Sequence, residues 1–260
     1  MSEPLLVVDD VVVEFDGFRA LNHATVRVQR GELRFLIGPN GAGKTSLIDV
    51  VTGLTKPTSG SVRFEGRDVT SIREHDRVRL GIGRSFQTPT VFQSLTVVEN
   101  LDLAASFHGR MMSLLRTRRG LSPAVAAALH RIGLAPQHNK PAGSLSHGQK
   151  QWLEIGMLLV QSPKLLLLDE PVAGMSVDER QATGELLTEL AGEHTIVVIE
   201  HDMAFLRQFA HQVTVLHEGR VLAEGSVAEV QADQRVHEVY IGRSRDERSG
   251  ATVTDEESSR

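Results

Sequence analysis

The segment Gly38-Pro39-Asn40-Gly41-Ala42-Gly43-Lys44-Thr45 decides the fold, because it matches the pattern GxxxxGK[ST] of phosphate-binding loops. The residues before it, Leu33 to Ile37, are an apolar run of the kind that forms a strand buried on both faces of a mainly parallel sheet. From Lys44 onward, apolar residues at helical spacing predict a helix that stops near Gly53. Strand, glycine-rich loop and helix in this order are the context that the motif requires.

This loop is suited to bind phosphate groups. Its glycines permit backbone torsions that turn successive N–H groups toward an anion, and the start of the following helix adds a partial positive charge. Lys44 would reach the β- and γ-phosphates of a nucleotide, and the Thr45 hydroxyl would bind Mg²⁺. A glycine-rich turn of chance composition is the alternative, against which the flanking strand and helix argue. The residues expected to bind the nucleotide here are Gly38, Pro39, Asn40, Gly41, Ala42, Gly43, Lys44, Thr45 and Ser46.

A second apolar strand, Leu165 to Leu168, ends in the carboxylates Asp169 and Glu170. Beside a phosphate-binding loop, Asp169 would hold Mg²⁺ through the metal's water shell, and Glu170 could orient and deprotonate an attacking water. Two acids that simply meet solvent at a strand end are the alternative. A GTPase would need an Asn-Lys-x-Asp guanine reader, and Asn139-Lys140-Pro141-Ala142 lacks its aspartate.

The rest of the chain alternates strand and helix patterns, which favours an α/β fold. Leucine and alanine at helical spacing over about residues 90–160 predict a helical lobe inserted into the sheet domain. Another helix is expected from about Val177 to Leu190. Residues 244–260 are polar and charged, so we expect a disordered tail. Further strands are predicted at Leu6 to Phe15, around Ala24 to Val28, and at Val62 to Phe64, Ile196 to Ile199, Val213 to Leu216 and Val221 to Ala223.

The composition is that of an ordinary globular protein: 260 residues, 40% hydrophobic and 23% charged. The sequence has no cysteine, which excludes disulfides and thiolate metal sites. A net charge of −5 argues against nucleic acid as a partner. No apolar run approaches the roughly 18–20 residues that span a bilayer. We therefore expect a soluble intracellular domain that reaches a membrane only through a partner.

Together these motifs resemble the ATP-binding cassette (ABC) family over about residues 5–240. Leu145-Ser146-His147-Gly148-Gln149 resembles the family's signature Leu-Ser-Gly-Gly-Gln, with His147 in the third place. Gln87 resembles the Q-loop glutamine and His201 the switch histidine. Phe15 stands where the family has an aromatic that stacks on adenine, and Ala173-Gly174-Met175-Ser176 stands at the D-loop without its aspartate.

The resemblance implies a P-loop NTPase core with a mainly parallel sheet, an N-terminal antiparallel β subdomain and an inserted α-helical subdomain. The ABC domain would span residues 5–243, with the helical subdomain at about 90–160. The cofactors would be ATP and Mg²⁺. Two cassettes would face head to tail, so that the ATP on one is touched by Ser146, Gly148 and Gln149 of the other. The catalytic residues would be Lys44, Glu170 and His201, and the metal site would comprise Thr45, Gln87 and Asp169.

Simpler interpretations exist for several of these residues. Ser146 and Gln149 form an S-x-x-Q capping box, which by itself marks only a helix start, and Ser176 and Glu179 form a similar box. The first is compatible with a nucleotide role, because a helix N-terminus is also an anion site. Taken alone, Gln87 would be a surface glutamine, His201 a structural histidine and Phe15 a core residue.

Within the family, the stretches at 83–89, 145–152 and 170–175 look most like the ATP-binding subunit of urea transporters, in the branched-chain amino acid and amide importer branch. The chain would then energise urea uptake at the cytoplasmic face of the inner membrane, attached to two permease subunits around Gln87 and Phe92. A second ATPase subunit, in a heterodimer or alternatively a homodimer, and a periplasmic or extracellular binding protein would complete the system. Alternatives are an importer of branched-chain amino acids or other amides, a soluble ABC ATPase, a non-catalytic scaffold and a small-molecule kinase.

Overall fold

The computed structural model describes residues 3–85, 88–106 and 121–239. The predicted tail, 244–260, and Gln87 lie outside the described residues. The strands are β1 (Leu6–Phe15), β2 (Phe18–Val28), β3 (Leu33–Ile37), β4 (Ser59–Phe64), β5 (Arg67–Asp68), β6 (Ile82–Arg84), β7 (Leu165–Asp169), β8 (Thr195–Ile199), β9 (Gln212–His217) and β10 (Arg220–Gly225). The helices are α1 (Lys44–Thr52), α2 (Glu74–Leu80), α3 (Val97–Ala105), α4 (Pro123–Arg131), α5 (His147–Leu159), α6 (Val177–Leu190), α7 (Met203–Phe209) and α8 (Val227–Ala232), with 3-10 turns η3 (Ala135–Gln137) and η4 (Ala142–Ser144).

The central sheet has the strand order β10-β9-β3-β8-β7-β6. All neighbours in it pair in parallel except the hairpin of β9 and β10, which is antiparallel. Every residue of β3, β7 and β8 is buried, as expected for strands covered on both faces. The expected α/β class with a mainly parallel sheet is confirmed.

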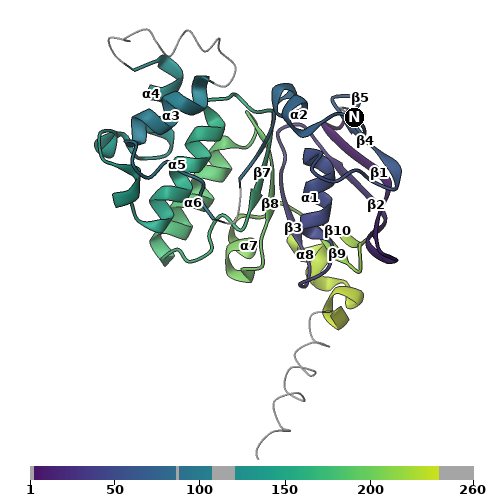
Figure 1. The fold of residues 1–260 in the computed structure, drawn as a ribbon. Helices are drawn as coiled ribbons and strands as arrows, with labels where there is room; N and C mark the ends of the chain where they lie inside the picture. The colour runs from purple at the N-terminus through teal and green to yellow at the C-terminus, as the bar shows by residue number, and fades with distance from the viewer. Residues whose placement is uncertain (1–2, 86–87, 107–120, 240–260) are drawn as a thin grey trace, which may run out of the picture.

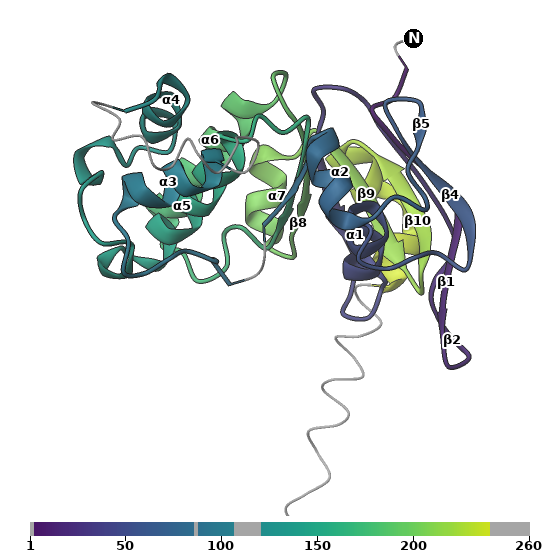
Figure 2. The same ribbon diagram turned by 45° about the horizontal axis from the view of Figure 1, so that its top comes forward.

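Successive side chains of these strands pack alternately into two separate hydrophobic cores. Leu33, Phe35 and Ile37 of β3 belong to the core that they share with helices α3 to α8. Leu36 belongs to a second core, which it shares with α1 and the antiparallel sheet. Figures 1 and 2 show the two sides, with α3 to α6 on one face of the central sheet and α1 on the other. The loop before α1 and the start of α5 therefore lie on opposite faces.

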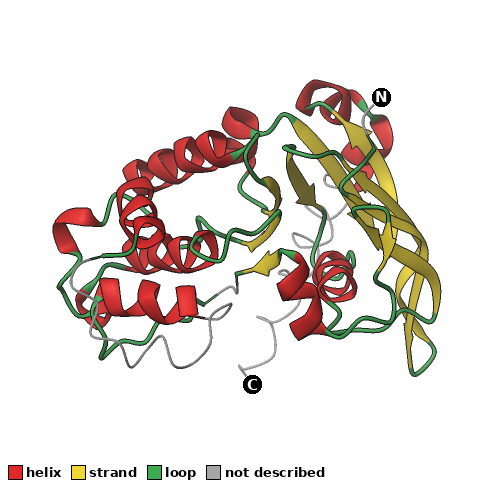
Figure 3. Ribbon diagram, turned by 90° about the horizontal axis from the view of Figure 1, so that it is seen from above, coloured by secondary structure: helices red, strands yellow, loops and turns green. Residues whose placement is uncertain are grey.

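The second sheet is antiparallel, with the order β2-β1-β4-β5. It confirms the antiparallel subdomain that the sequence resemblance implied, and it forms the strand-rich side of the molecule in Figure 3. The strand predicted at Val62 to Phe64 begins earlier, at Ser59. Ser59 pairs with Val12 of β1, and Gly60, expected in a turn, lies within β4.

The sequence analysis did not predict α2 and β6, which lie between Lys56 and Ser85. The reason is physical, because α2 has seven residues and only one of them, Arg77, is buried. Such a helix carries no apolar stripe from which a helical period could be recognised.

Arg77 instead anchors α2 through its charge. Its side chain is 1% exposed, and its guanidinium donates hydrogen bonds to four backbone carbonyls. Two of these, Val50 O at 2.6 Å and Val51 O at 2.8 Å, belong to the last turn of α1, where carbonyls lack helical partners. A cation at this end also complements the helix dipole. Arg77 thus fixes the far end of the helix that starts at the phosphate-binding loop.

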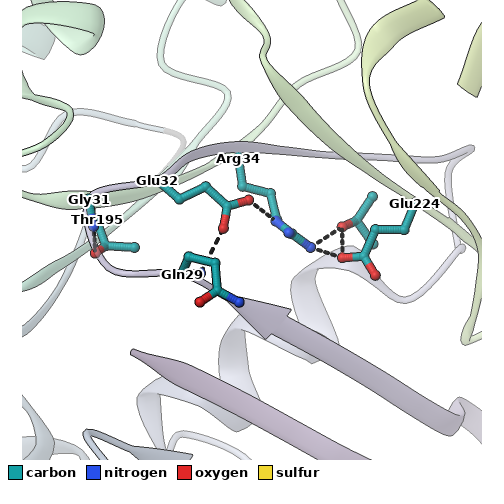
Figure 4. A network of polar contacts seen from close by, with 7 residues as sticks. Gln29, Gly31, Glu32, Arg34, Thr195 and Glu224 are labelled. Atoms are coloured by element: carbon teal, nitrogen blue, oxygen red, sulfur yellow. Dashed lines mark hydrogen bonds and ion pairs between the residues drawn. The ribbon is translucent and has the colours of Figure 1, made fainter. Parts of the chain in front are cut away.

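A second buried arginine joins the sheet to its terminal hairpin (Figure 4). Arg34 of β3 donates to Glu32 Oε1 at 2.6 Å and to Thr214 Oγ1 of β9 at 3.0 Å, and it forms an ion pair with Glu224 of β10. The turn of that hairpin reaches the phosphate-binding loop, where Gly219 N donates to Ala42 O at 3.0 Å. The Arg34 network therefore helps to support one side of the site.

We expect Arg77→Ala to lower the free energy of unfolding by about 3 kcal/mol, because four backbone carbonyls, two of them in buried hydrogen bonds, lose a charged donor. Denaturant unfolding measures the change. Arg79→Ala, in the same helix but with an exposed side chain, is the matched control and should shift stability by less than about 0.5 kcal/mol. Equal effects of the two substitutions would contradict this role of Arg77.

Candidate functional site

Three loops that carry sequence-predicted site residues begin at one edge of the central sheet. Leu36 of β3 and Asp169 of β7 are both in register with Ile199 of β8, which lies between them. The pairing continues past the strands, since Glu200 N donates to Leu36 O at 3.4 Å and Glu170 N to Ile199 O at 3.0 Å. Because the strands are parallel, their carboxyl ends bring the segments 38–45, 169–170 and 200–201 together.

The loop 38–45 has the backbone shape that an anion cradle needs. Gly41 and Gly43 adopt φ angles of 78° and 101°, in the left-handed region that favours glycine. A Cβ on Gly43 would lie 2.6 Å from the carbonyl oxygen of Ala20 in β2, so no larger residue fits. The Lys44 ammonium is folded over the loop, donating to Gly38 O at 2.7 Å and Pro39 O at 3.1 Å. Thr45 and Ser46 follow in the first turn of α1, as the sequence predicted.

Asp169 is a buried carboxylate beside this loop. Its burial raises its pKa, and the positive charges of Arg84 and Lys44 act in the opposite direction. Arg84 contacts Asp169 at 3.9 Å and Asp49 at 2.5 Å. Only β8 lies between the strand that leads into the loop and the strand that ends in Asp169, so the loop and the end of β7 lie at the same edge of the sheet. A cation at this place would favour the charged form that burial disfavours.

The donors near Asp169 suit Mg²⁺, which takes hard oxygen ligands and keeps several waters. The Thr45 hydroxyl and the Asp169 carboxylate are such ligands. Over the ranges that the structure describes, no group of three or more His, Asp or Glu side chains is arranged to hold a metal. The third predicted metal residue, Gln87, lies outside the described residues.

The structure brings Glu170 and His201 into contact across the ends of β7 and β8. Glu170 Oε1 lies 3.3 Å from His201 Nδ1, and both side chains are accessible to solvent. Glu170 has φ 51°, a left-handed conformation that is uncommon for a residue with a side chain. Such strain is typical of functional positions. An acid and a histidine in contact, next to a phosphate cradle, could activate a water and contact a terminal phosphate.

Glu200 is a site residue that the sequence analysis missed. It is 1% exposed, and its carboxylate accepts hydrogen bonds from Val172 N at 3.3 Å and His201 N at 3.1 Å. Burial raises its pKa, and these backbone donors partly oppose the rise. Glu200 thus ties the loop after Glu170 to the loop that carries His201. An acid directly after an apolar strand was the available signal, but its partners are set only by the fold.

Ser146 and Gln149 form the predicted capping box at the start of α5. Ser146 Oγ accepts from Gln149 N at 3.1 Å, and Gln149 Oε1 accepts from Ser146 N at 3.1 Å. Ser146 also donates its hydroxyl proton to Glu179 Oε1 at 3.0 Å, and Gly148 is buried beside it. The capping interpretation is confirmed, whereas contact with a nucleotide on a second subunit stays a prediction.

Phe15 ends β1 and is 52% exposed, so the interpretation of this residue as a core side chain is wrong. It pairs in register with Phe18, which is 66% exposed, across the turn at Asp16 and Gly17. Phe18 is a second aromatic that the sequence analysis did not single out. Stacking of Phe15 on adenine remains a prediction.

Known protein families match two parts of this chain. A family model described as ABC transporter matches residues 21–173. A second, described as branched-chain amino acid ATP-binding cassette transporter, matches residues 220–246.

Relatives match along almost the whole chain. The high-affinity branched-chain amino acid transport ATP-binding protein LivG of Escherichia coli K12 is 36% identical, with 93% of this chain and 99% of that protein covered. BraF of Pseudomonas aeruginosa, described in the same way, is 33% identical with the same coverage. A crystal structure of a nucleotide-free ATP-binding cassette from an ABC transporter is 32% identical, with a TM-score of 0.80 over 92% of this chain and 99% of that one. Another cassette, in its ADP conformation, is 32% identical with a TM-score of 0.81 over 93% of this chain and 100% of that one.

Asp202, next to His201, gives a prediction with a defined pH dependence. It caps α7 by accepting from Ala204 N at 2.8 Å and Phe205 N at 3.0 Å, and it pairs with Arg180 at 2.7 Å. The Phe205 hydrogen bond is the main cause that lowers its pKa. A lowered pKa means stabilisation that is present above the unfolded value, about 3.9, and is lost as pH falls through the folded value.

We therefore expect Asp202→Ala to cost about 1 kcal/mol of unfolding free energy at neutral pH, and progressively less as the medium becomes more acidic. Urea unfolding at a series of pH values measures this. Asp202→Asn keeps a capping oxygen and should retain part of the stability with a weaker pH dependence. A cost that is independent of pH would show that the charge of Asp202 does not contribute.

Proposed function

The chain belongs to the ABC transporter family, and we propose that it is the ATP-hydrolysing subunit of an importer of branched-chain amino acids. As a family member it is an ATP hydrolase coupled to transmembrane transport. The observation that carries the catalytic assignment is the contact of Glu170 with His201 at 3.3 Å beside the glycine loop. The cargo assignment is supported by the names of LivG and BraF and by the match at residues 220–246.

In the proposed reaction, the loop 38–45 and the Lys44 ammonium bind the phosphates of ATP. Thr45, Asp169 and Gln87 would hold Mg²⁺, and the metal would supply positive charge beside the phosphates. Glu170 orients a water and accepts its proton while the water oxygen bonds to the γ-phosphorus. The bond from that phosphorus to the β–γ bridging oxygen breaks, and ADP and phosphate leave. His201, which lies against Glu170, would contact the γ-phosphate.

We infer that two cassettes enclose the nucleotides between them. The start of α5 lies on the opposite face of the central sheet from α1, so a second subunit can bring its Ser146, Gly148 and Gln149 to the loop of the first. The exposed Phe15 would stack on adenine. Charge-assisted hydrogen bonds to the terminal phosphate would drive the closure. A different ATPase chain is the proposed second subunit, with a second copy of this chain as the alternative.

Over the described ranges, no helix has the length and apolar character needed to cross a bilayer. We propose that the chain reaches the cytoplasmic face of the membrane by docking on two permease subunits that receive cargo from a binding protein. The docking face would include Phe92, which is 51% exposed and follows closely after Gln87 in the chain. The ABC domain would span 5–243, with the helical subdomain at about 90–160.

The names of the relatives favour branched-chain amino acids as the cargo. The sequence motifs had instead predicted urea. Urea remains the alternative cargo. The residues of the ATPase site do not distinguish the two, because they contact the nucleotide and not the cargo.

We expect Glu170→Gln to bind ATP normally and to hydrolyse it roughly 10²–10⁴-fold more slowly, because the water loses its base. A phosphate-release assay measures turnover and calorimetry measures binding. Lys44→Ala should lose nucleotide binding itself, since the loop loses its only lysine donor. Unchanged turnover in Glu170→Gln would remove this residue from catalysis.

The cargo is tested by uptake in cells that express the chain together with its permease subunits and binding protein. We expect uptake of radiolabelled leucine that is lost in Glu170→Gln, and no uptake of radiolabelled urea. Urea uptake that depends on Glu170, without leucine uptake, would overturn the amino acid assignment and support the alternative.

A further inference from the structure

We propose that Glu179 is a positioning residue that holds the Ser146 hydroxyl and its own negative charge at the tip of α5 until two ATP-loaded cassettes close. Glu179 lies in the first turn of α6, beyond the D-loop position, and the family motifs quoted above do not include it. The inference rests on the proposed function, because it concerns the step at which Ser146 meets the nucleotide of a second subunit.

The geometry places the Glu179 carboxylate directly over the start of α5. Its Oε1 accepts from Ser146 Oγ at 3.0 Å, and its Oε2 accepts from Ser176 N at 3.0 Å and Ser176 Oγ at 3.1 Å. A Cβ on Gly148 would lie 2.6 Å from Glu179 Oε1. The absence of a side chain at Gly148 therefore allows the carboxylate to approach the first turn of α5.

The carboxylate is charged at neutral pH. The hydrogen bond from Ser176 N is the main cause that lowers the pKa of Glu179, and the bonds from Ser146 and Ser176 side chains act in the same direction. Glu179 thus places a negative charge at a helix N-terminus, which is where a phosphate would bind.

The Ser146 hydroxyl cannot serve Glu179 and a phosphate at once. A hydroxyl has one proton to donate, and Ser146 gives it to Glu179 while its oxygen accepts from Gln149 N. A γ-phosphate at the tip of α5 would need that proton and would be repelled by the neighbouring carboxylate. On closure, Ser146 must therefore give up its hydrogen bond to Glu179 before it can donate to the phosphate. Because this bond is lost, association of the ATP-loaded subunits is weaker than the new phosphate contacts by themselves would make it.

The other capping boxes in the described residues show what is particular to Glu179. Within the part of the chain that the structure describes, the carboxylates of Glu99 and Glu229 accept hydrogen bonds only from the cap residues of their own helices, Thr96 and Ser226. Over the same residues, Glu179 is the one acid of the three that also bonds to the cap residue of a second helix. The box of α5 itself uses the neutral Gln149 at the position where the other three have glutamate. A neutral amide can therefore complete such a box.

This comparison supplies the test. Glu179→Gln keeps a side-chain oxygen for Ser176 N, as Gln149 does for Ser146 N, but removes the charge. Glu229→Gln makes the same change in a box remote from Ser146 and is the matched control. Both are introduced into full-length Glu170→Gln protein, which keeps its ATP. Sedimentation velocity then gives the ATP concentration for half-maximal association, both with the proposed second ATPase subunit co-expressed and with the chain alone.

We expect Glu179→Gln to lower that ATP concentration roughly tenfold, the size of one charge-assisted hydrogen bond, and Glu229→Gln to leave it unchanged. Ser146→Ala should raise it, and the gain from Glu179→Gln should shrink in the Ser146→Ala background, because the exchanged hydroxyl is gone. ATP binding to the unassociated subunit, measured by calorimetry, should be the same with and without Glu179→Gln. Circular dichroism checks that α6 is retained.

Association of Glu179→Gln at the same or a higher ATP concentration than its parent would overturn the inference, and would show that Glu179 only packs α6 against α5. An equal gain in the Ser146→Ala background would also overturn it. If the Glu170→Gln parent binds ATP but never associates, the proposed closure fails and the role of Glu179 falls with it. If that parent does not bind ATP, the nucleotide site itself is wrong.

Discussion

The parallel pairing of β3, β8 and β7 is the constraint on which the site depends. It requires the three strands to end at the same edge, and the backbone bonds from Glu200 to Leu36 and from Glu170 to Ile199 extend that alignment into the loops. The cradle, the acid and the histidine come from distant parts of the chain. They meet because each directly follows a buried strand. A shift of one residue in the register of such a strand would turn its side chains from one hydrophobic core to the other.

The charged groups that the fold buries serve two different purposes. Arg77 and Arg34 are satisfied by carbonyls, a hydroxyl and carboxylates, and they stabilise the scaffold on either side of the loop 38–45. Asp169 is buried as well, and its burial raises its pKa although the positive charges of Arg84 and Lys44 oppose the rise. Together with the left-handed backbone of Glu170, it makes this edge costly for the protein alone. Bound cation and nucleotide can offset that cost, which is why such costs gather at functional positions.

The glycine loop, the strand that precedes it and the acidic end of β7 could be predicted from the sequence, because each is a local pattern in neighbouring residues. Helix α6 was predicted with its bounds for the same reason, since Ser176 marks its start. Helix α2 was missed because a single buried arginine holds it. Glu200 was missed, and Glu179 was recognised only as a member of a capping box, because their partners in other elements depend on tertiary packing. Local motifs could thus be predicted from the sequence, whereas contacts between side chains of different helices and strands could not.

The capping and nucleotide interpretations of Ser146 describe the same physical property. A helix N-terminus has N–H groups without helical partners, and either a side chain or an anion can satisfy them. In the single chain, Gln149 satisfies the cap backbone while Glu179 occupies the hydroxyl. The Ser146 hydroxyl and the N–H groups of Ser146 and Gln149 are thus bonded within the protein, on the face of the sheet opposite the loop 38–45. If the nucleotide of a second subunit binds at this tip, as we propose, its terminal phosphate would compete with Glu179 for the Ser146 hydroxyl.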